Sequence, residues 1–248
     1  SNNTAVGSVA LLNNTTGAEN TAVGSGSLDT NTTGQQNTAV GYNTLTNTNT
    51  GQQNVAIGRA ALNDNTSGSN NTGVGYNSLA ANTTASGVTA VGHQALTANT
   101  TGTGNVAVGK ASLLSNTTGT NNVAVGQNSL DACTTGTQNV AVGHDALTAV
   151  TTGEKNIGIG TFSGQLITTG EDNVGIGQQT LEATTTGNRN TAIGTRALDV
   201  NTTASDNVAI GHETLRLNTT GHSNVAVGAN ALDANTTASF NTAVGFQA

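Results

Sequence analysis

The sequence of 248 residues contains no proline, no methionine and no tryptophan, and it has a single cysteine, Cys133. Aromatic residues make up 2% of the chain and charged residues 8%, whereas an ordinary globular domain has about 25% charged residues. The lack of proline excludes a collagen-like triple helix, and one cysteine cannot build an intrachain disulfide scaffold. No run of about 18 apolar residues is present, so we expect no membrane insertion. A thick aromatic core is not expected either.

Positive charge is also scarce, because six Lys and Arg residues face thirteen Asp and Glu residues and the formal net charge is −7. Nucleic acid binds to basic surfaces. We therefore expect no nucleic-acid partner.

A 17-residue repeat dominates what is present. The unit N-[TV]-A-[VI]-G-x-x-[AST]-L-x-x-N-T-T-G-x-x starts at Asn3 and recurs without insertion or deletion. Fourteen full repeats cover residues 3–240 and a partial repeat covers residues 241–248, and we number the positions of the unit 1 to 17. We expect a single repeat array over residues 1–248. Neither end has the atypical capping repeat that is usual for solenoids, so we also expect a segment of a longer fibre.

Richness in Asn, Thr and Gly is also typical of disordered tracts. A disordered chain, however, has no need to keep Val or Ile at position 4 and Gly at position 5 in all 15 copies. Seventeen residues cannot hold two helices with loops, and Gly, Asn and β-branched residues are poor helix formers. Alternation with period two indicates a strand, and the glycines at positions 5 and 15 indicate corners. We predict an all-β parallel β-solenoid (β-roll) with one coil per repeat.

The same alternation predicts which residues form the interior. Coils stacked at the strand spacing of about 4.8 Å would give a rod about 70 Å long. We expect positions 2 and 4, such as Val55 and Ile57, to face the interior together with the leucine at position 9, such as Leu62. The variable positions 6, 7, 10, 11, 16 and 17 should face solvent. They hold Arg59, Lys110, Asp145, Glu154, Lys155 and Arg189.

Two irregularities refine this prediction. The tenth repeat has Gly164 instead of the leucine at position 9, and we expect Phe162 or Ile167 to fill the vacancy, because lost core volume destabilises unless it is refilled. Position 12, usually Asn, becomes Cys133, Val150 and Ile167 in successive repeats. This indicates an inward-facing position with an internal Asn ladder, and drift at an exposed position is the alternative.

Positions 1, 3 and 5 are restricted as well, to Asn, to Ala or Gly, and to Gly, with one exception at position 1. If positions 2 and 4 face inward, these positions face outward and should be free to vary. A strand restricted on both faces is typically buried on both faces. We therefore expect copies of the chain to contact one another through small residues, and a tight corner with an Asn ladder is the alternative. The examples are Asn54, Ala56, Gly58, Ala107 and Ala141.

The segments N-V-A-I-G at Asn54–Gly58 and N-V-A-V-G at Asn105–Gly109 resemble the head repeats of YadA-like trimeric autotransporter adhesins. The fuller unit at Asn37–Gly51 is similar to repeats of bacterial and phage tail-fibre-type surface proteins. The resemblance covers the whole chain and implies a left-handed β-roll that assembles as a homotrimer. The unit is longer than is usual in YadA-like heads, and this sequence contains no coiled-coil stalk, membrane anchor or self-cleaving chaperone domain.

No set of residues indicates catalysis, metal binding or a cofactor. His93, His144 and His212 share position 6 but are three and four coils apart, about 14 and 19 Å, and His222 occupies another position. A metal ion needs ligands at about 2 Å. We expect the neighbours His144 and Asp145 to point to opposite faces of a strand. Neither the acidic ladder of calcium-binding β-rolls nor a phosphate loop that opens a helix is present. We expect no enzyme activity.

Two further features have a structural and a chemical interpretation. The segments Asn31–Thr33 and Asn99–Thr101 match the N-glycosylation sequon, but we favour a ladder of side-chain hydrogen bonds over a sugar-coated fibre. We expect Cys133 to be a small buried residue instead of a reactive thiol.

Two classes of function remain. The first is a structural fibre: a shaft, adhesin or tail-fibre segment outside the cell, on a cell surface, appendage or virion, with a cell-surface or glycan receptor as its external partner. The second is a solenoid surface that binds ice or glycans through its Thr and Asn ladders. Positions 13 and 14 are nearly uniform Thr, with Asn49 and Ser67 among the exceptions. They lie beside a glycine corner, so we rank ice binding second.

Overall fold

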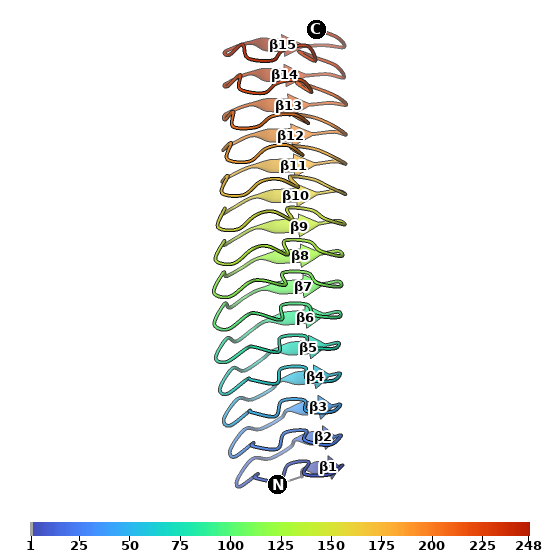
Figure 1. Cartoon of the computed structure of the whole chain (residues 1–248), viewed down its shortest axis with the longest axis vertical. Coiled ribbons are helices and arrows are strands. Elements are labelled where there is room, and N and C mark those ends of the chain that lie inside the picture. Colours follow the sequence, from blue (N-terminus) through green and yellow to red (C-terminus); the bar gives the residue numbers. More distant parts are fainter. Residues whose placement is uncertain (1) are drawn as a thin grey trace. The chain divides into compact units, whose positions relative to one another are not determined.

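The computed structural model describes residues 2–248, and these form an all-β parallel β-solenoid of about 14 coils with no helix (Figure 1). The predicted fold class is confirmed. The chain divides into two compact units, residues 2–121 and residues 122–248. Each unit consists of stacked coils, and each coil contributes one three-residue strand at positions 2 to 4 of the repeat.

The first unit contains seven strands. They are β1 (Thr4–Val6), β2 (Thr21–Val23), β3 (Thr38–Val40), β4 (Val55–Ile57), β5 (Thr72–Val74), β6 (Thr89–Val91) and β7 (Val106–Val108). The second unit contains eight strands. They are β8 (Val123–Val125), β9 (Val140–Val142), β10 (Ile157–Ile159), β11 (Val174–Ile176), β12 (Thr191–Ile193), β13 (Val208–Ile210), β14 (Val225–Val227) and β15 (Thr242–Val244).

Within each unit, every strand pairs in parallel with the strand one repeat later, at zero offset in the repeat. Ala39 lies opposite Ala56 in the first unit, and Ala192 lies opposite Ala209 in the second. The corners are also joined from coil to coil, since the Leu62 amide donates to the Ser78 carbonyl at 3.0 Å. Backbone groups outside the strands therefore find partners in the neighbouring coil, as buried backbone groups require.

The coil closes through residues with positive φ. Gly58 at position 5 has φ 121°, and a Cβ added there would lie 2.6 Å from the Gly75 carbonyl oxygen, so only glycine fits. Position 9 has φ near 50° although it holds leucine, as at Leu62 (φ 51°). This conformation is uncommon for a residue with a side chain. It turns the Leu62 side chain into the coil interior, where it is fully buried.

The interior is formed by the opposite strand face from the one we predicted. Ala56 and Asn54 are fully buried, whereas Ile57 is 41% exposed and Val55 is half-buried. The prediction that positions 2 and 4 face inward is therefore wrong. The prediction that Ala56, Ala107 and Ala141 face other copies is wrong for the same reason, because all three side chains are buried inside their own coils.

The width of the coil explains this orientation. Leu62, Leu96 and Leu130 are buried in the interior, which confirms the prediction for position 9. The strand passes so close to these leucines that little room remains for a side chain at position 3. A methyl group added at Gly73 would already lie 3.3 Å from Leu62 Cδ1, a tight contact that leaves no room for a larger side chain. Alanine or glycine fits opposite the leucine, and valine or isoleucine does not.

Two ladders of buried Asn side chains complete the interior. At position 1, the Asn54 amide nitrogen donates to Asn37 Oδ1 at 3.0 Å, and Asn54 Nδ2 donates to the Gly68 carbonyl at 2.9 Å. At position 12, Asn82 Nδ2 donates to Asn65 Oδ1 at 2.8 Å. The predicted inward ladder at position 12 is confirmed.

The ladder at position 12 is interrupted where Asn is replaced. Thr48 follows Asn31 in this ladder and carries no amide donor. Among the described residues, the buried atoms Asn31 Oδ1 and Thr48 Oγ1 therefore have no hydrogen-bond partner. A contact in this ladder has to span one coil spacing. The side-chain amide of Asn spans this distance, whereas the shorter Thr hydroxyl does not always do so.

The tenth repeat fills its vacancy with an isoleucine. A Cβ added at Gly164 would lie 2.6 Å from Leu147 Cδ2 and 2.9 Å from Ile167 Cδ1, so these two side chains occupy the space of the missing leucine. Ile167 is buried, as one of our two alternatives predicted. Phe162 is half-buried and packs edge-on against the His144 ring instead, with ring centroids 5.7 Å apart.

Candidate interaction surfaces

The strand face that points away from the coil carries a stripe of apolar side chains. We define the apolar stripe as the residues at positions 2 and 4, which form the outer face of the strands. Position 4 is Val or Ile in every coil, and position 2 is Thr, Val or Ile. In the first unit, Val40, Ile57 and Val108 are 37%, 41% and 37% exposed. In the second unit, Val125, Val142, Ile159, Ile176, Ile193 and Ile210 are 36–38% exposed, and Val244 is 71% exposed.

The stripe is more apolar in the second unit. Position 2 is Thr in five of the seven strands of the first unit, whereas it is Val or Ile in six of the eight strands of the second. A single exposed valine is ordinary on a protein surface, but a contiguous apolar patch marks a place where another surface packs. Each unit therefore presents a patch that suits contact with a protein.

The variable positions lie mostly on the outside, as predicted, although position 7 is buried at Gly26 and Ala111. Arg59, Lys110, Lys155 and Arg189 are exposed, and Asp145 and Glu154 are half-buried.

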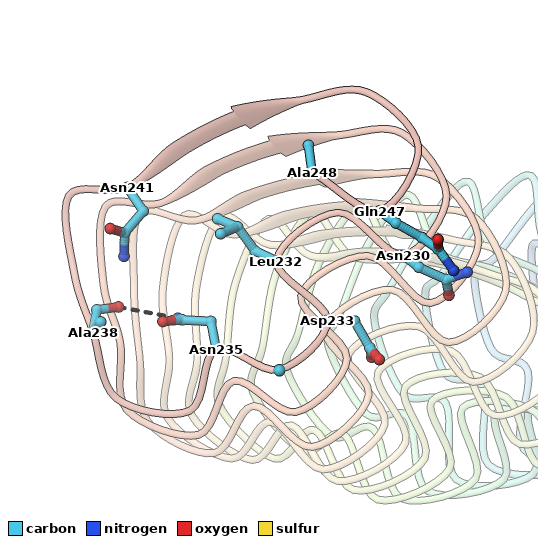
Figure 2. Close-up of a pocket in the computed structure, with 9 residues that line it drawn as sticks. Asn230, Leu232, Asp233, Asn235, Ala238, Asn241, Gln247 and Ala248 are labelled. Atoms are coloured by element: carbon cyan, nitrogen blue, oxygen red, sulfur yellow. Dashed lines mark hydrogen bonds between the residues drawn. The ribbon is translucent and has the colours of Figure 1, made fainter.

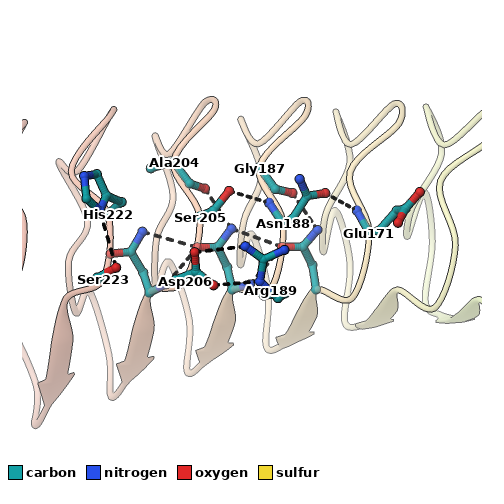
Figure 3. A network of polar contacts seen from close by, with 12 residues as sticks. Glu171, Gly187, Asn188, Arg189, Ala204, Ser205, Asp206, His222 and Ser223 are labelled. Atoms are coloured by element: carbon teal, nitrogen blue, oxygen red, sulfur yellow. Dashed lines mark hydrogen bonds and ion pairs between the residues drawn. The ribbon is translucent and has the colours of Figure 1, made fainter.

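In the second unit several of these charges pair from one coil to the next. Arg189 forms a bidentate contact with Asp206, with Nε 2.7 Å from Oδ1 and Nη2 3.0 Å from Oδ2 (Figure 3). The hydrogen bond from Arg189 lowers the pKa of the Asp206 carboxyl. Arg216 also contacts an acid one coil away, with a single contact of 3.0 Å between its Nε and Asp233 Oδ1. These pairs link neighbouring coils on the exposed surface.

The histidines do not converge. Within residues 2–248, no group of three or more His, Cys, Asp or Glu side chains lies close enough together to hold a metal ion. His144 Nδ1 lies 3.3 Å from Asp145 Oδ2, so the expectation that these neighbours point to opposite faces is wrong. Both residues lie in a turn, where Asp145 has φ 52°, and the alternation of a strand does not apply there.

The glycosylation sequons coincide with the inner Asn ladder. Asn31 is fully buried, and its Nδ2 donates to Asn14 Oδ1 at 2.7 Å and to the Gly34 carbonyl at 3.1 Å. Asn99 makes the equivalent contacts with Asn82 Oδ1 and the Gly102 carbonyl, both at 3.1 Å. The nitrogen that a sugar would modify is thus enclosed and bonded in the folded chain, which favours the ladder interpretation.

The thiol of Cys133 is buried at position 12, as predicted. Burial raises the pKa of Cys133 to about 11, although a contact with the Gly136 carbonyl has the opposite effect. The thiolate is the reactive form of cysteine. Little thiolate exists near neutral pH, so Cys133 serves as a core residue and not as a reactive thiol.

The exposed Thr rank is one residue wide. Position 14 is Thr or Ser in all full repeats and is exposed throughout. At position 13 the hydroxyls bond to the backbone of the next coil, since Thr66 Oγ1 donates to the Thr83 carbonyl and Thr100 Oγ1 to the Thr117 carbonyl, both at 3.0 Å. Position 14 is therefore exposed throughout, whereas position 13 is mostly half-buried and joins neighbouring coils.

A pocket of about 630 Å³ lies at residues 230–248 (Figure 2). Leu232, Asn235 and Asn241 line it, and they occupy positions 9, 12 and 1 of the repeat. The Asn235 side chain donates to the Ala238 carbonyl at 3.0 Å. These positions form the interior of the coils within the stack. The pocket is therefore lined by core residues and adds no separate chemistry.

In residues 2–248 there is no helix whose length and hydropathy would let it cross a membrane. Comparison of the chain with models of protein families finds no match, and comparison with curated proteins finds none either.

Proposed function

We propose that this chain is a segment of an extracellular structural fibre, a shaft or adhesin or tail-fibre segment on a cell surface, appendage or virion, in which three copies associate through their apolar stripes. The observation that carries this proposal is the outward exposure of Val or Ile at position 4. Its role is mechanical, and we assign it no catalytic, metal-binding or cofactor-binding site.

The uniformity of the stripe supports a partner. Position 4 is Val or Ile in all 15 copies, whereas position 6, two residues along, ranges from Ser and Thr to Arg, His and Tyr. In the described residues of the single chain, both positions are exposed or half-buried in every coil. Exposure alone would let position 4 vary as freely as position 6. Contact with the same apolar surface at every coil accounts for the restriction, because each Val or Ile then loses its remaining contact with water.

The number of copies rests on the resemblance of the N-V-A-I-G and N-V-A-V-G segments to the heads of trimeric adhesins. A second copy of this chain suits the stripe because both surfaces would then carry the same 17-residue repeat. Equivalent residues would recur at the same coil spacing on both sides. The left-handed winding that the resemblance implies stays a prediction.

Lysine substitution on the stripe tests the proposal. Ile159 and Ile193 are exposed in the single chain, so the double variant Ile159→Lys/Ile193→Lys should keep its fold and its far-UV circular dichroism. Burying unpaired ammonium groups between copies is costly, so this variant should sediment as a monomer. The matched control is Thr152→Lys/Thr186→Lys at the exposed position 14 of the same unit, which should sediment as the wild-type trimer does. Unchanged assembly of the stripe variant would contradict the proposal.

Ice binding is the second candidate, and the observation that favours it is the regular exposed Thr rank at position 14. The threonines at position 13 beside it are mostly half-buried, and their hydroxyls bond to the backbone, so they do not form a second regular exposed rank. Thermal hysteresis separates the two functions, because a structural fibre should show none and an ice-binding surface should show a clear freezing-point gap.

A further inference from the structure

Position 6 of five consecutive coils in the first unit holds an unusual series of side chains. We define the aromatic–cationic ladder as Tyr42, Arg59, Tyr76, His93 and Lys110. All five residues are exposed. The ladder contains both tyrosines of the chain. In a sequence that is 2% aromatic, their placement one above the other at a single surface position indicates a binding surface.

Arg59 lies between the two tyrosine rings. Its Cζ is 5.9 Å from the ring centroid of Tyr42 and 5.7 Å from that of Tyr76, within the range of cation–π contacts. The Tyr76 ring in turn stacks on the His93 ring, with centroids 5.2 Å apart and planes at 22°. The rings hold the guanidinium in place before any ligand arrives, so less side-chain freedom is lost on binding.

No carboxylate of the described residues neutralises Arg59. The other three arginines lie near acids one coil away: Arg189 at 2.7 Å from Asp206, Arg196 at 3.7 Å from Glu213, and Arg216 at 3.0 Å from Asp233. Within residues 2–248, Arg59 forms no ion pair, and its polar contacts are the two tyrosine rings. Its N–H donors remain available to an anion from outside the chain.

The charge around the ladder has the sign that an anion needs. Arg59 and Lys110 are the only Lys or Arg residues among residues 1–121, and both belong to the ladder. The acidic residues of that stretch are Glu19, Asp29 and Asp64, and none of the 15 copies of position 6 is acidic. A chain with a net charge of −7 therefore carries a local cationic line on its first unit.

We propose that the aromatic–cationic ladder binds an acidic polysaccharide. The guanidinium of Arg59 takes a carboxylate or sulfate group, for which its planar fork is suited. Lys110 takes a second anionic group three coils away, about 14 Å along the coil axis. The hydroxyls of Tyr42 and Tyr76 and the ring nitrogens of His93 can form hydrogen bonds with the sugar hydroxyls that lie between the two anionic groups.

The shape of the ladder favours a long ligand. Five side chains at one coil spacing extend over about 19 Å in a straight line, which matches an extended polymer and exceeds a single small anion. The site lies on one chain and does not depend on the proposed trimer.

Binding to immobilised polymers tests the inference. The probes are dextran sulfate and polygalacturonate as acidic polysaccharides, neutral dextran as the uncharged match, and inorganic polyphosphate as a polyanion without sugar. The wild-type chain should bind both acidic polysaccharides and should not bind dextran. Arg59→Gln should weaken binding about tenfold or more, as expected for the loss of a charge-assisted contact. Tyr42→Ala/Tyr76→Ala should weaken it as well, because the guanidinium is no longer held.

The matched control is Arg189→Gln, which removes the same charge from an exposed, ion-paired arginine of the second unit and should leave binding unchanged. Equal weakening by Arg59→Gln and Arg189→Gln would overturn the inference, since binding would then follow net charge alone. Polyphosphate binding as tight as polygalacturonate binding would overturn the saccharide assignment. Disassembly of the oligomer by Arg59→Gln, with no binding of any acidic polymer by the wild type, would show a subunit contact instead.

Discussion

The ladder of Asn side chains at position 1 makes a quantitative prediction for Asn207→Ala. Asn207 is fully buried in the second unit. Its Nδ2 donates to the Gly221 carbonyl at 3.0 Å and to Asn190 Oδ1 at 3.2 Å. Its Oδ1 accepts from the backbone amide of Asn224 at 3.0 Å and from Asn224 Nδ2 at 3.1 Å. One side chain therefore satisfies groups in the coil before it, in its own coil and in the coil after it.

Truncation to alanine removes the acceptor of the Asn224 amide and a donor to the Gly221 carbonyl. Both groups lie in the interior, where each unsatisfied backbone group costs about 1–3 kcal/mol. The expected loss of stability is therefore about 2–6 kcal/mol. A substitution on an exposed surface without such contacts changes stability by about 0.5 kcal/mol or less.

Urea denaturation followed by far-UV circular dichroism measures this loss, with Thr203→Ala at the exposed position 14 as the control. Asn207→Ala should move the unfolding midpoint of the coils around it well below that of the wild type, and the control should not. Hydrogen exchange at the Asn224 amide should speed up in the same variant, because its acceptor is gone. A midpoint equal to that of Thr203→Ala would refute the role assigned to the ladder.

Three further predictions concern the core and the surface charges. Ala141→Leu should lower the melting temperature sharply because Ala141 lies against the buried leucines, whereas Val142→Leu on the outer face should leave the melting temperature of the single chain nearly unchanged. Cys133 should resist maleimide at pH 7 until the chain is unfolded, because burial raises its pKa to about 11. Asp131→Asn should raise the melting temperature at pH 7, since burial and then Asp145 raise the pKa of Asp131 and thereby disfavour its charged form in the fold.

The sign of the last effect sets its pH dependence. A carboxyl whose folded pKa is raised destabilises the fold when it is ionised, so the advantage of Asp131→Asn is present at neutral pH. It should shrink as the pH falls through the raised folded pKa towards 3.8. An advantage that grows on acidification would contradict the assignment. A melting temperature of Val142→Leu as low as that of Ala141→Leu would contradict the orientation of the strand, and rapid labelling of folded Cys133 would contradict its burial.

The solenoid could be predicted from the sequence because each coil corresponds to one copy of the same 17-residue repeat. An uninterrupted period of 17, glycine corners and a leucine in almost every repeat leave few alternatives. The three nonpolar residues Cys133, Val150 and Ile167 identified position 12 as inward-facing. Replacement of a polar residue by nonpolar ones in successive repeats indicates a position in the core. For the vacancy at Gly164 the sequence left Phe162 and Ile167 as alternatives, and the structure assigns it to Ile167.

The orientation of the strand could not be predicted from alternation, because both alternating sets are restricted. Ranking by hydrophobicity places Val55 and Ile57 inside and Ala56 outside, which is the reverse of the structure. The limit on size at position 3 was the useful signal. Only Ala or Gly fits opposite a buried leucine in a coil this narrow, whereas the larger residues fit on the outside.

The contact between His144 and Asp145 was missed for a different reason. The residue after the corner glycine and its neighbour lie in a turn, and the positive φ of Asp145 brings the two side chains together. The aromatic–cationic ladder could be found only after the coil period was known, since Tyr42, Arg59 and Tyr76 become neighbours only when successive repeats are stacked.

The association of three chains through their outward Val and Ile side chains is tested by native mass spectrometry of the unmodified chain. A complex with three times the mass of one chain is predicted. It should persist in the Thr152→Lys/Thr186→Lys variant and fall to the mass of one chain in the Ile159→Lys/Ile193→Lys variant. A wild-type chain that appears only at the mass of a monomer, at concentrations where it is fully folded, would contradict the association and leave the apolar stripe facing water.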